Sequence, residues 1–124
     1  MALVKQQVKP LSVSPSRRRS DADIIQRFEQ NSYDADVTLN LAEDFVLLDG
    51  SSNTVTATLE TPTVGGIMAT LKATDVSNAV DVDTEDDGTI DGSSSYTFTT
   101  AEDAIVLISD SGGDWNIVSE FTNV

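Results

Sequence analysis

The apolar residues of this chain follow two different periods, a helical one before residue 33 and a strand-like one after residue 37. The stretch SDADIIQRFEQNS, residues 20–32, begins with Ser20, a residue type that caps helix N-termini. Three apolar side chains of this stretch fall on one helical face: Ile24, Ile25 and Phe28. We therefore expect one short amphipathic helix, followed by a linker, within residues 20–33.

From Val37 onward the apolar residues alternate with polar ones or form short continuous runs, as strands do. Turn-forming Gly, Asp, Asn and Ser residues separate eight such segments. The segments are 37–41, 45–48, 54–59, 66–73, 79–83, 95–99, 104–109 and 114–121. The pattern predicts an all-β body over residues 34–124, built as an antiparallel β-sandwich or a barrel-like fold.

Residues 1–19 have the composition of an extended arm. Pro10 and Pro15 restrict their neighbours to extended conformations, and serines are frequent between them. The arm also carries apolar residues such as Leu3 and Val4, which suit a segment that becomes ordered against a partner. A terminus without a role is the alternative.

A short internal similarity links two parts of the body. TLNLAEDFVLL at 38–48 and TFTTAEDAIVL at 97–107 share a threonine, an Ala-Glu-Asp motif and an apolar run at an offset of 59 residues. Duplication of a strand-turn-strand unit would produce this similarity, and so would convergence of turn chemistry. Both explanations remain open.

The composition excludes several classes of function. A chain of 124 residues has the length of one domain. It contains neither cysteine nor histidine, so disulfides, thiol chemistry, the usual zinc and haem ligation and a His-based catalytic triad are ruled out. No apolar run reaches the length of a membrane span, and the N-terminus lacks the apolar core of a signal peptide. We expect a protein made in a cytoplasm that is not an enzyme and needs no cofactor or metal.

The net charge of −14 is divided very unevenly along the chain. Residues 1–20 carry five cations and no acid, whereas residues 21–124 carry two cations and all 21 acids, a net charge of −19. Such a body should repel nucleic acid and other copies of itself, and the arm is suited to an acidic surface. Arginine pairs well with carboxylates, so an acidic protein face explains SPSRRRS with less conflict than phosphates do.

We therefore expect a partner-binding site at the N-terminal end, without nucleic acid or membrane as partner. Its cations and helix residues are Lys5, Lys9, Arg17, Arg18, Arg19, Ile24, Ile25 and Phe28.

The acidic stretch DVDTEDDGTIDG, residues 81–92, raises the question of a calcium site. Counted from Asp83, it places acids and Gly88 as an EF-hand loop does, but Ser94 stands where the bidentate glutamate belongs. The flanking segments also have strand patterns, so an EF-hand is rejected. A looser surface site for Ca²⁺ stays open beside the simpler interpretation of a solvated turn between strands.

Two further features admit both a structural and a functional interpretation. The carboxylate pairs that precede apolar segments, such as Glu43 with Asp44, are typical of turns, although glycosidases also use paired carboxylates. Trp115 is most simply a core or interface aromatic, and its alternative role is to stack on a sugar.

Several motifs of residues 37–119 resemble a module of tailed-bacteriophage structural proteins. They are LAEDFVLLDGSSNTVTATL, the Pro62–Gly66 corner PTVGG, the pair LKATD and SNAV, GTIDG at 88–92 and the closing VLISDSGGDWNIVS. The sequence departs from the commonest pattern by having EDDG before the GTIDG motif and GGDW near the last hairpin. The resemblance covers about two thirds of the chain.

The resemblance implies a small all-β module, usually a homotrimer, that serves as a capsid decoration or cement protein or as a tail-fibre segment. The family has no catalytic residues to transfer. Because a short chain with a basic arm fits the first role, we expect a virion protein on the outer surface of the capsid, with its arm bound to the major capsid protein. The alternative is a tail-fibre or receptor-binding module whose loops 83–94 and 110–115 meet a host glycan. A calcium-assisted β-domain of cellular origin is a third hypothesis.

Overall fold

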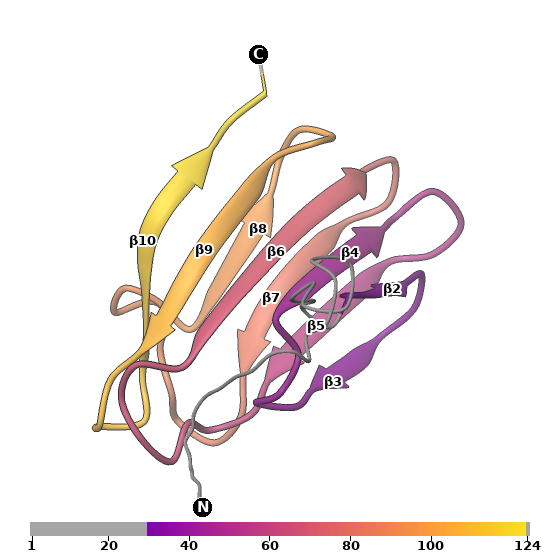
Figure 1. Ribbon diagram of the computed structural model, residues 1–124. Helices are drawn as coiled ribbons and strands as arrows, with labels where there is room; N and C mark the ends of the chain where they lie inside the picture. The colour runs from indigo at the N-terminus through magenta and orange to yellow at the C-terminus, as the bar shows by residue number, and fades with distance from the viewer. Residues whose placement is uncertain (1–29, 124) are drawn as a thin grey trace, which may run out of the picture.

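The computed structural model describes residues 30–123, which form two stacked β-sheets (Figure 1). Nine strands and no helix occur within that range. The strands are β2 (Gln30–Tyr33), β3 (Val37–Leu39), β4 (Phe45–Asp49), β5 (Val55–Leu59), β6 (Met68–Asp75), β7 (Val80–Thr84), β8 (Ser95–Phe98), β9 (Ala104–Ser109) and β10 (Trp115–Phe121). The expectation of an all-β body is confirmed.

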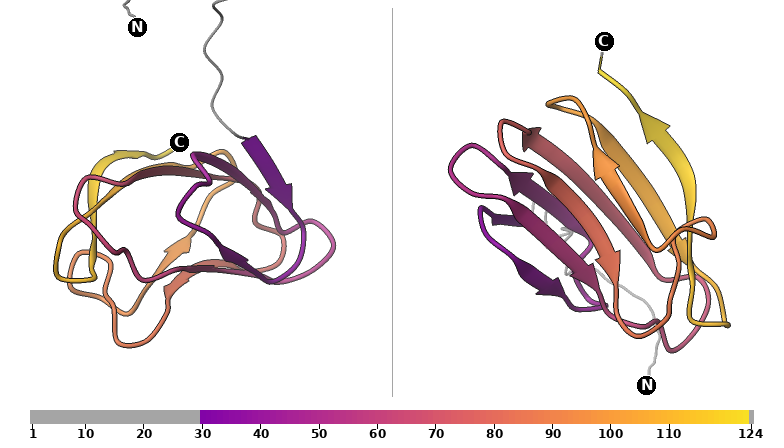
Figure 2. Two further views of the ribbon diagram at one scale, coloured as in Figure 1. Left: turned by 60° about the horizontal axis from the view of Figure 1, so that its bottom comes forward. Right: turned by 180° about the vertical axis from the view of Figure 1, so that it is seen from behind.

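One sheet has the strand order β10-β9-β6-β4-β2 and the other the order β3-β5-β7-β8. Figure 2 shows the two layers from the end and from behind. From β2 to β7 the chain changes sheet after every strand, and it returns to each sheet in the same direction. Strands β2, β4 and β6 are therefore parallel, as are β3, β5 and β7.

The last three strands pair antiparallel with their neighbours: β8 with β7, β9 with β6 and β10 with β9, so that β10 again runs in the direction of β6. Both sheets are thus mixed, and the expected antiparallel sandwich is wrong in this respect. Strand pattern alone predicts that a segment is a strand but not which neighbour it meets, since that depends on how the connections cross between layers.

Two neighbouring turns of the chain, β4–β5 and β6–β7, stack on each other with an offset of 25 residues. Phe45 of β4 pairs with Thr70 of β6, and Val55 of β5 pairs with Val80 of β7. The corners between these strands repeat as well. The Asp49 carboxylate accepts a hydrogen bond from the Ser51 backbone N–H at 2.9 Å, and the Asp75 carboxylate accepts one from the Ser77 N–H at 2.8 Å.

Two asparagine side chains form hydrogen bonds between each of these corners and the corner that precedes it in the stack. The Asn53 side chain donates to the backbone oxygen of Asp34 at 3.0 Å, and the Asn78 side chain donates to that of Gly50 at 2.8 Å. A Cβ atom on Gly50 would lie 2.5 Å from the Asn78 oxygen and 2.8 Å from the Asp75 oxygen. Only glycine therefore allows the two corners to approach this closely.

The core lies between the two sheets, where alternate residues of each strand point inward. Parallel register places apolar residues beside apolar residues, as in Val46 with Leu71 and Val55 with Val80. The side chains that are nearly or fully buried are Leu39, Val46, Leu48, Val55, Ala57, Leu59, Ala69, Leu71, Ala73, Val80, Val82, Ile90, Phe98, Ile105, Leu107 and Trp115. Their alternation along the strands is what the sequence pattern predicted.

The structure differs from the expected short helix where the two overlap. Gln30–Tyr33, which we expected at the helix end and in the linker, form β2 and pair in parallel with β4. Residues 20–29, the remainder of the predicted helix, lie outside the described residues. Asn31 and Tyr33 both donate hydrogen bonds to the buried carboxylate of Glu43, so tertiary contacts decide the conformation of a segment with weak local preference.

Candidate functional site

The predicted partner-binding residues all lie outside the described part of the chain. They are Lys5, Lys9, Arg17, Arg18, Arg19, Ile24, Ile25 and Phe28. Their role therefore stays a prediction. The described residues offer two surfaces that could bind a partner, an acidic corner between β7 and β8 and the outer face of the five-stranded sheet.

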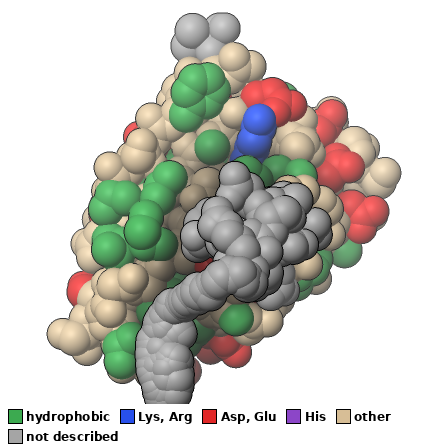
Figure 3. All heavy atoms as spheres, in the orientation of Figure 1, with side chains coloured by type: hydrophobic (Ala, Val, Ile, Leu, Met, Phe, Trp, Pro, Cys, Tyr) green, Lys and Arg blue, Asp and Glu red, His purple; other side chains and the backbone are tan. Residues whose placement is uncertain are grey.

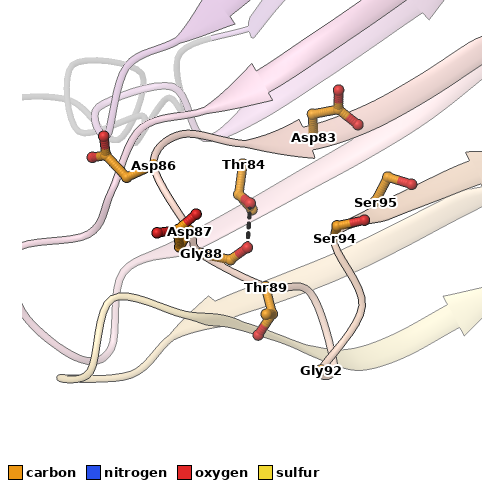
Figure 4. Close-up of a pocket in the computed structure, with 9 residues that line it drawn as sticks. All are labelled: Asp83, Thr84, Asp86, Asp87, Gly88, Thr89, Gly92, Ser94 and Ser95. Carbon is orange, nitrogen blue, oxygen red and sulfur yellow. Dashed lines mark hydrogen bonds between the residues drawn. The ribbon is translucent and has the colours of Figure 1, made fainter.

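The acidic corner is a depression of about 640 Å³ between β7 and β8. It is lined by Asp83, Thr84, Asp86, Asp87, Gly88, Thr89, Gly92, Ser94 and Ser95. Figure 4 shows the carboxylates of Asp83, Asp86 and Asp87 spread apart and not directed at a common centre. Among residues 30–123, no group of three or more acidic side chains could hold a metal ion. The corner thus lacks the converging oxygen ligands that Ca²⁺ requires.

Several polar side chains of the corner stabilise its own backbone. The Thr84 hydroxyl donates to the Gly88 backbone oxygen at 2.6 Å (Figure 4). The Asp86 carboxylate accepts a hydrogen bond from the Thr61 hydroxyl at 3.0 Å, and the Asp91 carboxylate accepts one from the Ile117 N–H at 2.9 Å. Asp86 and Asp91 have φ values of 53° and 51°, a left-handed conformation that aspartate tolerates better than most residues. This part of the sequence therefore forms a turn, as the simpler interpretation expected.

The loop between β9 and β10 packs beside the acidic corner. The backbone N–H of Thr89 donates to the Asp114 carboxylate at 2.9 Å, and the N–H of Trp115 donates to the Thr89 oxygen at 2.8 Å. Within the loop, backbone N–H groups of Asp114 and Gly112 donate to the Asp110 carboxylate and lower the pKa of that group. The two loops that we expected at a glycan site are thus neighbours.

Trp115 belongs to the core of the body. Its side chain is only 2% exposed, and its Nε1 atom has no hydrogen-bond partner among the described residues. A sugar stacks on an accessible ring face, so this residue is not placed to bind one. The core interpretation of Trp115 is confirmed.

The two Ala-Glu-Asp motifs of the internal similarity each bury one carboxylate, although at different positions of the motif. In the first motif Glu43 is 4% exposed and receives hydrogen bonds from β2 and from the Asn40 N–H at 2.9 Å. In the second motif Asp103 is 3% exposed and receives one from the Asn123 N–H at 2.6 Å. The motifs therefore attach an edge strand and the C-terminal end to the sheet, which is structural turn chemistry.

The outer face of the five-stranded sheet, which points away from the core, carries several apolar side chains beside polar ones such as Thr70 and Lys72. Its apolar side chains come from four neighbouring strands and are Phe45, Leu47, Met68, Ala104, Val106, Ile108 and Phe121. Met68 and Phe121 are 51% and 59% exposed. Figure 3 shows hydrophobic side chains gathered over β9 and β10 on this face. Exposed apolar side chains gathered on one face usually mark a place of contact.

The charges on and beside this face are few. Lys72 is the only cation among residues 30–123, and its ammonium lies 2.8 Å from the Glu102 carboxylate. A shallow depression of about 330 Å³ crosses β4 and β6 and is lined by Asp44, Phe45, Met68 and Thr70. The face therefore offers an apolar surface with an acid at one end.

Sequence reasoning did not identify this face as a binding surface. Its signal was present, since FVLL at 45–48 and AIVLIS at 104–109 are continuous apolar runs. Apolar and polar residues alternate in a strand that has water on one side, whereas a strand covered on both sides can be apolar at every position.

Comparison with known proteins does not identify the chain. No protein-family model matches it, and no curated protein matches it in sequence. The part of the chain that the structure describes contains no helix with the length and apolar character needed to cross a membrane.

Proposed function

We propose that this chain is a virion structural protein, a capsid decoration or cement protein that binds the major capsid protein through its N-terminal arm. The observation that carries the proposal is the separation of charge. Five of the seven cations lie in residues 1–20, and residues 30–123 hold 18 acids beside a single lysine. Of these two segments, the arm is the one suited to a favourable electrostatic contact with an acidic protein surface.

The polar outer face of the four-stranded sheet supports this role, because it suits a surface that faces solvent. On the four-stranded sheet the outward residues are threonine, serine and aspartate, with Thr58 and Asp81 as examples. If the protein binds the assembled shell and not the free capsid subunits, binding stabilises the shell by mass action. A homotrimer would strengthen a weak arm contact through effective concentration. We propose no catalytic activity, because the chain has no histidine or cysteine and the buried carboxylates Glu43 and Asp103 are occupied by structural hydrogen bonds.

The test is co-sedimentation with shells assembled from the major capsid protein of the same virus. Deletion of residues 2–19 and the triple variant R17A/R18A/R19A should both lose binding, and the triple lysine variant should keep most of it because it retains the charge. Undiminished binding after the deletion would exclude the arm. Mass measurement of the same samples reports whether they are trimeric.

A second candidate, a tail-fibre module that binds a host glycan, is favoured by the contact between the loops 83–94 and 110–115. Their depression is lined by hydroxyl and carboxylate groups that could accept hydrogen bonds from a sugar. Glycan-array binding that is lost in the double variant D83N/D87N would support this candidate over the first.

A further inference from the structure

We propose that Ile24, Ile25 and Phe28 pack on the outer face of the five-stranded sheet of their own chain, over the depression between β4 and β6. This inference goes beyond the proposed function and does not depend on it. It reassigns three residues that we expected among the partner contacts and leaves the cations of residues 5–19 for the partner.

The first support is the nature of the face. Apolar side chains of β4, β6, β9 and β10 form one surface, and Met68 and Phe121 are more than half exposed. Burial of such apolar side chains is favoured over their contact with water. The opposite sheet has no apolar outward residue on its strands, so this asymmetry is a property of one face and not of the whole body.

The second support is where the chain enters the sheet. Gln30 is the first residue of β2 and pairs with Phe45, which in turn pairs with Thr70. The N-terminal end of β2 therefore lies at the end of the sheet where Phe45, Met68 and Thr70 line the depression. Phe28 is two residues away, a reach of about 7 Å, and the depression lies one to two strand spacings, about 5–10 Å, from β2.

The third support is chemical complementarity. The segment 24–28, IIQRF, has three apolar residues for the apolar depression and one charge, that of Arg27. Asp44 lies in the lining of the depression, so a carboxylate stands beside its apolar residues, and carboxylates pair well with arginine. The segment thus matches the depression in both polarity and charge.

A second copy of the body fits the face less well. A second copy must overcome the long-range repulsion between two bodies that each carry 18 acids against Lys72 over residues 30–123, whether or not the bodies also meet in a trimer. The segment 24–28 is tethered to the sheet, which gives it a high effective concentration without that repulsion.

A cross-linking experiment tests the proposal directly, because the natural chain has no cysteine. The double variant F28C/M68C should form an intramolecular cross-link under oxidation or with a short bis-maleimide, with a yield that does not depend on protein concentration. The matched control is F28C/T97C, which places the second thiol on the outward side of β8, on the other sheet, and should cross-link poorly. Equal yields for both pairs would overturn the proposal.

The alternative occupants are separated in the same assay. A tagged F28C chain mixed with an untagged M68C chain reports contact between copies, and a dominant intermolecular product would assign the face to a second copy and overturn the intramolecular packing. Independently, the variant I24S/I25S/F28S should bind an apolar dye such as ANS severalfold more strongly than the natural chain, whereas deletion of residues 2–19 should not. Equal dye binding by the natural chain and the triple variant would show that nothing had been uncovered. These measurements need no capsid, so their failure is distinct from failure of the proposed function.

Discussion

The outer faces of the two sheets differ far more than their inner faces do. On the four-stranded sheet the outward strand residues are all polar: Thr38, Thr56, Thr58, Asp81, Asp83, Ser95 and Thr97. On the five-stranded sheet they include Phe45, Leu47, Val106 and Ile108. Inward residues are apolar in both sheets. One sheet therefore presents a polar outer face and the other an outer face with several apolar side chains, and the same strand geometry serves both because successive side chains point to opposite sides.

The outer faces differ only as long as the strands of both sheets keep their register. The largest loss of stability is expected at Gly50, where two corners of the chain approach each other most closely. G50A should lower the free energy of unfolding by about 3 kcal/mol, because its Cβ would meet two backbone oxygens of the next corner and overpacked positions respond on that scale. Chemical denaturation measures the loss. The control is G65A, whose Cβ would meet nothing closer than 3.5 Å. Similar free energies of unfolding for the two variants would contradict the close approach of the two corners at Gly50.

The edge strand β2 of the five-stranded sheet is held by hydrogen bonds to one buried carboxylate, that of Glu43. E43Q should cost about 2 kcal/mol, because an amide cannot accept all the hydrogen bonds that Glu43 receives and buried donors are left unsatisfied. Hydrogen exchange of β2 should increase more than that of β9. E60Q, at a half-buried acid with one hydrogen bond from the Leu41 N–H, is the control and should have a smaller effect. Uniform loss of protection would argue that Glu43 is not specific to β2.

A reciprocal exchange compares the two outer faces directly. V106T should lower the free energy of unfolding by about 1 kcal/mol in the full chain, because a covered face must desolvate the new hydroxyl. T58V, on the polar face, should stay within about 0.5 kcal/mol of the natural chain. Thermal or chemical unfolding of both variants provides the comparison. Equal tolerance at the two positions would mean that both faces meet water.

The two sheets are also joined at one edge by a titratable contact. The Tyr96 hydroxyl donates to the Glu120 carboxylate at 2.7 Å, and burial, followed by this hydrogen bond, raises the pKa of Tyr96 above its ordinary value of 10.0. A raised folded-state pKa contributes stability that is complete below pH 10 and is lost as the pH rises above that value. Stability should therefore fall in alkali, and Y96F should flatten that fall. An unchanged alkaline profile in Y96F would remove Tyr96 as its cause.

The smallest change in stability is expected at acid pH, from Asp110 in the loop before β10. Backbone N–H groups of Asp114 and Gly112 lower the pKa of Asp110 from its ordinary value of 3.8. Stability from this group is present above that value and is lost as the pH falls through the lower folded-state pKa. D110N should make unfolding slightly less sensitive to pH below 4 than in the natural chain, as followed by tryptophan fluorescence. A steeper acid dependence in D110N would contradict the assignment.

The sequence pattern predicted most strands but not their arrangement. Alternation located strands such as 54–59 and 79–83 within a residue or two, because inward positions had to be apolar. It missed β2, where Asn31 and Tyr33 are specified by a hydrogen bond to distant Glu43 and not by local preference. It also missed the 25-residue repeat, whose clearest trace is Ser-Asn at 52–53 and again at 77–78.

Of the two candidate binding regions, the arm and the apolar outer face, the first could be predicted from the sequence and the second required the structure. Charge separation between the arm and the body is visible from the sequence, because it needs only the positions of the cations. The apolar outer face required the register, since residues of β4, β6, β9 and β10 become one surface only when those strands are neighbours. Phe45 and Phe121 are 76 positions apart in the chain and lie on the same side of one sheet.

By itself, therefore, the sequence determined that residues 37–121 fold as strands, which side of each strand is apolar and where the charge lies. The tertiary structure decided that β2, β4 and β6 run parallel, that the acidic stretch is a corner without a converging carboxylate set, and that apolar runs share one outer face. The physical reason is that side-chain alternation is a local property of extended backbone, whereas strand neighbours are selected by long-range packing and by the path of the connections.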